Sequence, residues 1–179
     1  MIVDLTKTIK DKMTGYPEDP ILSLKQIKHF IKDGYNDYLL KMNMHTGTHI
    51  DGLNHMGSGS LMSEIELTQF MGTARVVDPL NYTYQGEEVV VIECHGHYLE
   101  ENFVRQLIEH PLKFIVIDND SVDTAPYFLH KLLFIKGIYI VENAINLDRL
   151  PKDSFFDIFA IPLKIESDSS PIRLFAKIK

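Results

Sequence analysis

The stretch His45-Thr46-Gly47-Thr48-His49-Ile50-Asp51-Gly52-Leu53-Asn54-His55 places three histidines and an aspartate within eleven residues. Imidazole nitrogens and carboxylate oxygens are the ordinary ligands of catalytic divalent metals, and two histidines with one carboxylate form a usual set. The four side chains lie at even separations, so an extended chain would place all of them on one face. The stretch therefore predicts a metal site.

A straight strand cannot gather these side chains around one ion. At ~3.3 Å per residue, His45 and Asp51 would lie roughly 20 Å apart, whereas each ligand atom lies ~2.0–2.2 Å from a zinc ion. A regular helix aligns His45 with His49 but turns Asp51 away. Gly47 permits the sharp bend that is needed, and Gly52 offers a second one. The motif is therefore predicted to be a strand end that runs into a bent loop.

The residues just before the motif alternate between apolar and polar side chains. This period of two predicts a strand whose core face carries every second residue, namely Tyr38, Leu40, Met42 and Met44. His45 then leaves from the opposite, more polar face.

The rest of the chain alternates between strand-like and helix-like patterns. Strands are predicted over residues 2–6, 21–31, 74–77, 89–92, 114–117 and 138–141. Helices are predicted over residues 64–71, 99–108 and 126–133, with Gly72 as the C-terminal cap of the first. Residues 153–165 and 172–178 are predicted to form a hairpin around a turn at 167–171. The expected class is α/β, in one domain over residues 1–179.

The amino-acid composition indicates which binding partners and which cellular compartment to expect. The formal net charge is −7, from 18 basic and 25 acidic side chains, which argues against a nucleic-acid partner. The lone Cys94 excludes an internal disulfide and fits a reducing compartment. No run of apolar residues approaches the length of a transmembrane helix, and the first residues lack the apolar stretch of a signal peptide. We expect a soluble, cytoplasmic protein without a membrane partner.

The motif resembles the H-x-G-T-H-x-D-x-x-x-H signature of the cyclase-like metal-dependent hydrolases, which include bacterial kynurenine formamidase and isatin hydrolase. Further elements of that family are matched along most of the chain by Asp4-Leu5-Thr6, Tyr16-Pro17-Glu18-Asp19-Pro20, Asp33-Gly34-Tyr35-Asn36, Asp120-Ser121-Val122-Asp123, Ile161-Pro162-Leu163-Lys164 and Ser170-Pro171-Ile172-Arg173. The resemblance implies a swivelling β/β/α fold with mixed sheets and flanking helices. It also implies a homodimer or a larger homo-oligomer.

The resemblance further implies a metal centre with one or two divalent ions. His45, His49 and Asp51 would hold the first ion. Asp51 would bridge to a second ion bound by the remaining candidates, which are His55, His130 and Glu142. If only one ion binds, His55 becomes the general acid/base instead. The sequence is compatible with His55 as a metal ligand and with His55 as the general acid/base. Zinc is the expected metal, with manganese or iron as alternatives.

The implied activity is hydrolysis of an amide bond in a small molecule by metal-activated water. The expected substrate is an arylformamide such as N-formylkynurenine or a cyclic amide, and a lactone is an alternative. The rival interpretation is a metal-binding or structural protein of the same fold without turnover.

Some residues depart from the family pattern or fall outside it. Gly52-Leu53 stands where the family commonly has Ala-Pro, and the family's R-T-G-W-like segment is not recognisable in a chain without tryptophan. His95 and His97 have no matching family element and are interpreted as residues of a polar loop. Asp120 and Asp123 are predicted either to line the pocket or to stabilise turns.

Overall fold

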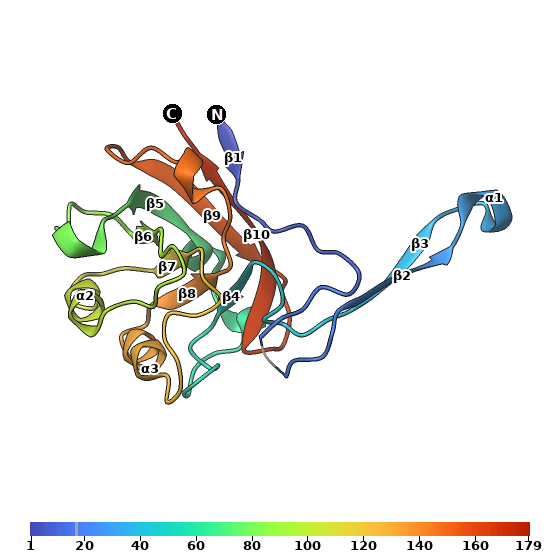
Figure 1. Cartoon of the computed structure of the whole chain (residues 1–179), viewed down its shortest axis with the longest axis horizontal. Helices are drawn as coiled ribbons and strands as arrows, with labels where there is room; N and C mark the ends of the chain where they lie inside the picture. Colours follow the sequence, from blue (N-terminus) through green and yellow to red (C-terminus); the bar gives the residue numbers. More distant parts are fainter. Residues whose placement is uncertain (17) are drawn as a thin grey trace.

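Three strands are buried on both faces and consist of apolar residues, apart from the glutamate that ends the third of them. The computed structural model describes residues 1–16 and 18–179, and in it these strands are β6 (Val89–Ile92), β7 (Phe114–Ile117) and β8 (Tyr139–Glu142). They pair in parallel, and β5 (Met71–Val76) continues the parallel ladder beyond β6. Helices α2 (Glu101–Leu107) and α3 (Phe128–Ile135) supply the crossovers that parallel strands require. Both helices lie on the same side of the sheet (Figure 1).

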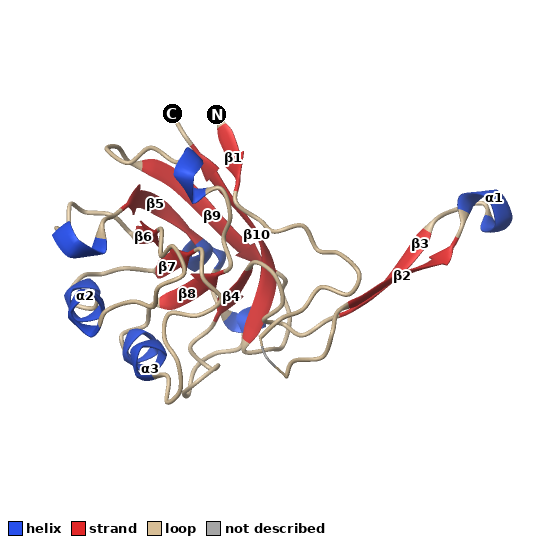
Figure 2. Ribbon diagram, viewed as in Figure 1, coloured by secondary structure: helices blue, strands red, loops and turns tan. Residues whose placement is uncertain are grey.

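Antiparallel strands close this ladder into a barrel. They are β4 (His49–Asp51), β9 (Phe156–Pro162) and β10 (Ser169–Lys177). The strand order is β10-β4-β8-β7-β6-β5-β9, and β9 pairs with both β5 and β10, so the ring is complete. The short strand β1 (Ile2–Asp4) adds to β10 outside the ring. Figure 2 shows the strands curving round into the barrel, with α2 and α3 lying to one side of it.

Alternate residues of the central strands serve two separate hydrophobic cores. Val91, Val116 and Val141 belong to the core inside the barrel, together with residues of β9 and β10. Ile115 and Ile140 point the other way and pack against α2 and α3. Because both faces are covered, these strands tolerate no polar face, and their continuous apolar sequence follows from that burial.

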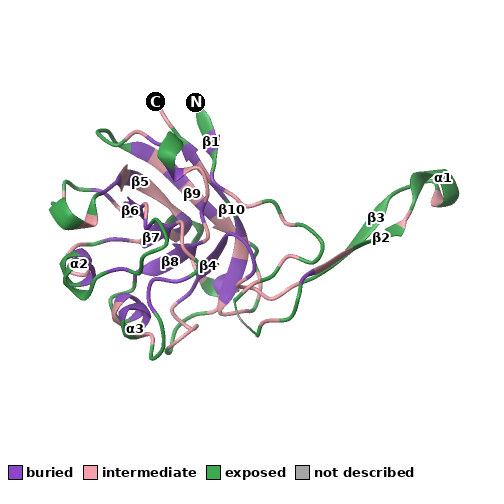
Figure 3. Ribbon diagram, in the orientation of Figure 1, coloured by how far each residue is buried: buried purple, intermediate pink, exposed green. Residues whose placement is uncertain are grey.

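A two-stranded arm extends from the barrel. It consists of β2 (Ser23–Lys28), the short helix α1 (Phe30–Asp33) and β3 (Asp37–Lys41). Figure 1 shows it projecting far from the barrel, and Figure 3 shows it as largely exposed. The predicted core face of residues 38–44 is therefore wrong. Every residue of β3 is exposed, Tyr38 at 57% and Leu40 at 48%. Among residues 1–16 and 18–179, the hairpin pairs only with itself and no sheet packs on it.

Two further local predictions are wrong for tertiary reasons. The predicted helix over 64–71 is two 3-10 turns, η1 (Met62–Glu64) and η2 (Leu67–Phe70), and Gly72 lies inside β5 rather than capping a helix. The predicted turn at 167–171 is partly strand, since Ser169, Ser170 and Pro171 pair with β4. The remaining 3-10 turns are η3 (Pro79–Asn81) and η4 (Leu147–Arg149).

Other elements are confirmed to within a few residues, including α2, β7, β8 and the C-terminal hairpin of β9 and β10. The segment 16–20, which resembles a family element, includes residue 17, which lies outside the described residues. Over residues 1–16 and 18–179, no helix is both long enough and apolar enough to cross a membrane.

Candidate metal centre

The bend in the motif precedes its strand. Gly47 has φ +77°, and the chain turns there before β4 begins at His49. Within β4, His49 and Asp51 share one face, while the fully buried Ile50 points into the barrel core. The bend returns His45 to the same place, with its Nδ1 2.8 Å from Asp51 Oδ1. The predicted bend at Gly47 is present, but the order of strand and bend is reversed.

Strand pairing brings the distant donors to the motif. His49 lies opposite Glu142 in the antiparallel register of β4 and β8, and His49 Nε2 is 3.4 Å from Glu142 Oε2. His130 on α3 approaches the same carboxylate, with its Nε2 3.2 Å from Glu142 Oε1. Two sets of donor atoms result, each with all atoms within 4.8 Å of one another: His45, His49 and Asp51 in one, and Asp51, His130 and Glu142 in the other.

The donor atoms of both sets fit a cation. His49 Nδ1 donates a hydrogen bond to the carbonyl oxygen of Gly47 at 2.9 Å, so the neutral ring presents the Nε2 lone pair to two carboxylates. His49 Nε2 and Asp51 Oδ1 are buried and lack a hydrogen-bond partner. His130 repeats the arrangement, because its Nδ1 donates to Asp123 Oδ1 at 2.5 Å while Nε2 faces Glu142. Without a cation, the lone pairs of the histidine Nε2 atoms face those of the carboxylate oxygens. A divalent metal bound between them would accept both kinds of lone pair.

The pKa values of the donor residues show that the site favours positive charge. Burial alone would lower the pKa of His49, but the negative charge of Asp51, aided by that of Glu142, raises it to about 10. Burial would likewise raise the pKa of Asp51, yet His49 and His45 hold it well below its usual range. The site therefore holds positive charge at neutral pH, as a proton or as a metal.

His55 lies in a third group of donors, beside the two clusters. Its Nδ1 donates to Asp168 Oδ2 at 2.8 Å, and Asp168 Oδ2 is 3.3 Å from His45 Nε2. The structure thus brings His55 together with His45 and Asp168, and it does not bring His55 into the set of Asp51, His130 and Glu142. Ser169 Oγ adds a contact of 3.0 Å to His45 Nε2.

The sequence analysis does not predict Asp168 as a residue of the site, because no local sequence feature identifies it. It lies more than a hundred residues after the motif, in a Ser-rich segment that reads as an ordinary turn. The start of β10 brings it to the site, since Ser169 pairs with Asp51. Gly52 N donates to the carbonyl oxygen of Asp168 at 2.9 Å, and a Cβ on Gly52 would lie 2.6 Å from that oxygen. The glycine that departs from the family pattern therefore permits close contact here.

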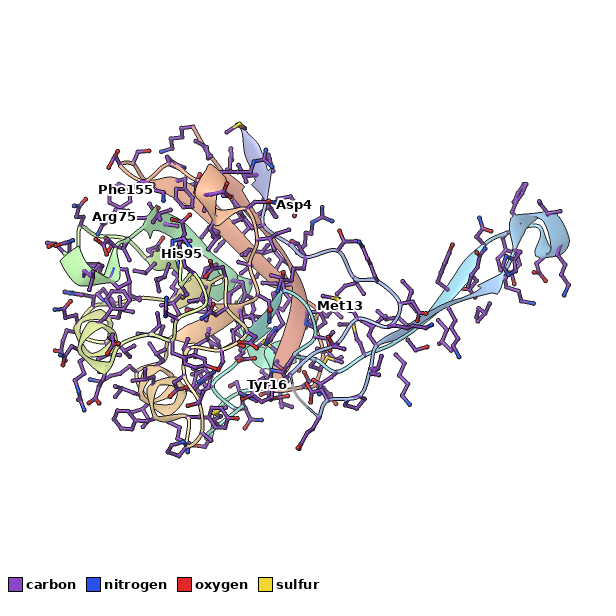
Figure 4. The ribbon with its side chains drawn as sticks, viewed as in Figure 1. Asp4, Met13, Tyr16, Arg75, His95 and Phe155 are labelled. Carbon is purple, nitrogen blue, oxygen red and sulfur yellow. The ribbon has the colours of Figure 1, made fainter. Side chains whose placement is uncertain are left out.

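A cavity of about 410 Å³ opens beside the donors. The loop before the arm forms part of its wall through Met13 and Tyr16. In Figure 4, Met13 lies on the side of the barrel that faces the arm, and Tyr16 lies at the lower edge of the barrel. Tyr16 and Tyr127 approach each other through their hydroxyls at 3.2 Å, and this hydrogen bond, with burial, raises the pKa of Tyr16 to about 12. The cavity is large enough for a small aromatic molecule.

The other candidate residues fall into two groups, those that support the site and those that lie outside it. Asp123 orients His130 and also accepts a hydrogen bond from Leu129 N at 2.6 Å, while Asp120 lines the cavity. Within the described part of the chain, His95 and His97 belong to no group of metal-binding donors. Burial raises the pKa of the Cys94 thiol to about 12, which leaves it protonated and unreactive.

Comparison with known proteins agrees with this geometry. The model of the putative cyclase family matches residues 3–93, just over half of the chain, including the whole motif. The chain belongs to the putative cyclase family. A kynurenine formamidase of Bacillus cereus is 26% identical to this cyclase-family chain, over 96% of the chain and 94% of the relative.

Solved structures share the fold of this cyclase-family protein. An isatin hydrolase bound to the product analogue thioisatinate matches with a TM-score of 0.83 at 18% identity, over 99% of this chain and 92% of that one. A predicted metal-dependent hydrolase from Bacillus stearothermophilus matches with a TM-score of 0.79 at 23% identity, over 98% and 97%. The expected α/β fold of mixed sheets and flanking helices is confirmed.

Replacement of Asp168 by Asn should weaken metal binding. The carboxylate contacts the outer nitrogen of His45, and loss of such a partner typically lowers metal affinity roughly ten- to a hundredfold. Competition titration with a chromophoric chelator measures this change, and the exposed Asp153→Asn serves as the control. Equal affinities of Asp168→Asn and the unaltered chain would show that Asp168 does not support His45 as a metal ligand.

The stability of the metal-free protein should depend on the His49 proton. Because the pKa of His49 rises from ~6.5 in the unfolded chain to about 10 in the folded chain, its stabilisation is complete below pH ~6.5 and is lost as the pH rises through about 10. In urea unfolding, the stability advantage of the chain over His49→Gln should shrink between pH 6.5 and pH 10. An advantage that stays constant over this range would contradict the assignment.

Proposed function

We propose that this protein is a metal-dependent hydrolase that cleaves an amide bond of a small molecule, either an arylformamide such as N-formylkynurenine or a cyclic amide. The observation that carries the proposal is the pair of donor sets that share Asp51 at the wall of a cavity. Similarity to a kynurenine formamidase and to an isatin hydrolase supports this reaction class.

We propose zinc as the metal, bound as one or two ions, with manganese or iron as alternatives. When bound, a divalent cation at these donors supplies Lewis acidity that activates water and polarises a carbonyl group. His45, His49 and Asp51 would hold one ion, and Asp51, His130 and Glu142 would hold the other. Mixed imidazole and carboxylate donors suit all three metals, and zinc most often takes this set.

His55 is proposed as the general acid/base rather than as a ligand. A carboxylate only accepts hydrogen bonds, so Asp168 fixes the proton of His55 on Nδ1 and leaves Nε2 as the basic atom. His55 Nε2 would take a proton from the attacking water and return it to the departing nitrogen of the amide. The side chain is partly exposed, which allows exchange of that proton with solvent.

Hydrolysis of N-formylkynurenine and formanilide tests the proposed activity. The zinc-loaded protein should hydrolyse an arylformamide, and removal of the metal by a chelator should abolish turnover until zinc is restored. His55→Gln should lower kcat roughly 10²–10⁴-fold while zinc content stays unchanged. His97→Gln, an exposed histidine outside the donor groups, is the matched control and should keep full activity.

The rival interpretation, a metal-binding protein without turnover, makes a different prediction for the same samples. Stoichiometric zinc without hydrolysis of any member of a panel of arylformamides, cyclic amides and lactones would contradict the hydrolase proposal.

We further infer that the protein acts in the cytoplasm, since its one thiol is buried and needs no oxidising compartment.

A homodimer is proposed from the exposed arm. An isolated two-stranded hairpin is marginally stable in water, yet this one exposes several large apolar side chains, namely Ile27, Phe30, Ile31, Tyr35, Tyr38, Leu39 and Leu40. Residues 23–41 carry four lysines and two aspartates, a charge of +2, which leaves 14 basic and 23 acidic residues, a charge of −9, for the rest of the chain. A second copy therefore offers a body of opposite charge to each arm.

Light scattering coupled to size exclusion tests this interface. The unaltered protein should have twice the chain mass of 20.6 kDa, and Ile31→Glu with Leu39→Glu should convert it to the monomer. Leu80→Glu is the matched control, because Leu80 is 88% exposed on η3 rather than on the arm. A monomeric unaltered protein at micromolar concentration, or a dimer that survives the arm substitutions, would contradict the proposal.

A further inference from the structure

Lys7 is held at the wall of the cavity by the same elements that carry the metal donors. Its backbone N–H donates to Thr48 Oγ1 at 2.8 Å, and Thr48 Oγ1 donates in turn to the carbonyl oxygen of Asn143 at 2.8 Å. Thr48 immediately precedes His49, and Asn143 immediately follows Glu142. The position of Lys7 is therefore tied to both donor sets.

The ammonium group of Lys7 has only a neutral partner. Its Nζ donates to Asn143 Oδ1 at 2.6 Å, and within the described chain no carboxylate lies within ion-pair distance of it. An ammonium group carries three N–H donors. Burial lowers the pKa of Lys7, while Asp120 and Asp118 act from further away to raise it. A half-buried cation that lines a cavity with donors to spare is suited to an anionic ligand.

Lys7 differs in charge from the other ionisable side chains that line the cavity outside the metal donors. Among the described residues that line it, Lys7 is the one lysine or arginine, whereas Asp19 and Asp120 contribute acidic groups away from the metal donors. An anionic substrate would be repelled by these two carboxylates unless a cation held it. Lys7 Nζ is bound to Asn143 and is not one of the metal donors, so it is free to bind a substrate group other than the reacting carbonyl.

We propose that Lys7, oriented by Asn143, forms a subsite for a carboxylate group of the substrate, so that the protein selects amides that carry a carboxylate. The inference rests on the proposed hydrolase function for its kinetic consequence, but the subsite itself is a binding property. The carboxylate would accept hydrogen bonds from Lys7 Nζ, while Asn143 Oδ1 keeps the ammonium directed into the cavity. Asn143 is thus a positioning residue and Lys7 a substrate-binding residue.

Kinetics with a matched pair of substrates test the subsite. The pair is 3-formamidobenzoate and formanilide, which share the formamide group and differ by the carboxylate. Lys7→Met keeps the length of the side chain and removes its charge, and it should raise KM for 3-formamidobenzoate roughly ten- to a hundredfold, the effect expected for loss of a charged hydrogen bond. Its KM for formanilide should change far less, so the ratio of the two KM values reports the loss of the carboxylate contact. Lys10→Met, an exposed lysine that does not line the cavity, is the control.

Two kinetic outcomes would overturn the proposal. Equal losses on both substrates would place Lys7 at the reacting carbonyl, and no loss on either would make it a structural residue. Zinc content and melting temperature of Lys7→Met are measured alongside. If Lys7→Met does not fold, Lys7→Gln replaces it, and Lys7→Arg should restore most of the selectivity for the carboxylate substrate.

A binding measurement separates failure of the subsite from failure of the hydrolase proposal. Calorimetry of the zinc-loaded protein with benzoate should give a Kd at least tenfold weaker in Lys7→Met than in the unaltered chain and in Lys10→Met. This result would support the subsite even if neither formamide is hydrolysed. An equal Kd in all three proteins would show that benzoate binds elsewhere, at the metal or the surface, and would overturn the subsite.

Discussion

The buried carboxylate of Asp51 is the group on which the rest of the site depends. It is 1% exposed, and its Oδ1 lies within 3.4 Å of nitrogens of both His45 and His49. An ionised carboxylate that loses its water costs several kcal/mol unless nearby positive charge offsets the loss. The fold therefore has to deliver cations to this point, either as protonated imidazoles or as a divalent metal. The two donor sets meet that requirement, and both of them include Asp51.

The pairing register of β4 in the barrel determines which side chains lie beside Asp51. β4 has only three residues, yet it pairs with β10 on one side and β8 on the other. The first pairing brings Ser169, and with it Asp168, beside the motif, and the second brings Glu142 opposite His49. A shift of one residue in either pairing would turn His49 and Asp51 into the hydrophobic core. Closure of the barrel and assembly of the metal centre are thus the same structural event.

The arm shows how far a local pattern can mislead. Its alternation of apolar and polar residues is that of a strand with one buried face, and β3 does form, but nothing in the described part of the chain covers it. Burial depends on what packs against a strand, and alternation does not specify the partner. The same arm leads directly into the motif at its C-terminal end, and the loop before it supplies Met13 and Tyr16 to the cavity. Any partner that covers the arm would therefore lie close to the substrate.

The dense ligand motif, the bend at Gly47, the buried parallel strands and the family resemblance can all be predicted from the amino-acid sequence. These features are local or periodic, so short-range chemistry and spacing are sufficient to predict them. Family resemblance added His130 and Glu142, which no spacing within the chain indicates. Only the tertiary structure decided that His55 lies with Asp168 rather than with His130, and that Lys7 faces the same cavity. The reason is physical: strand pairing and barrel closure join segments more than a hundred residues apart, and side-chain type alone does not encode which of them will meet.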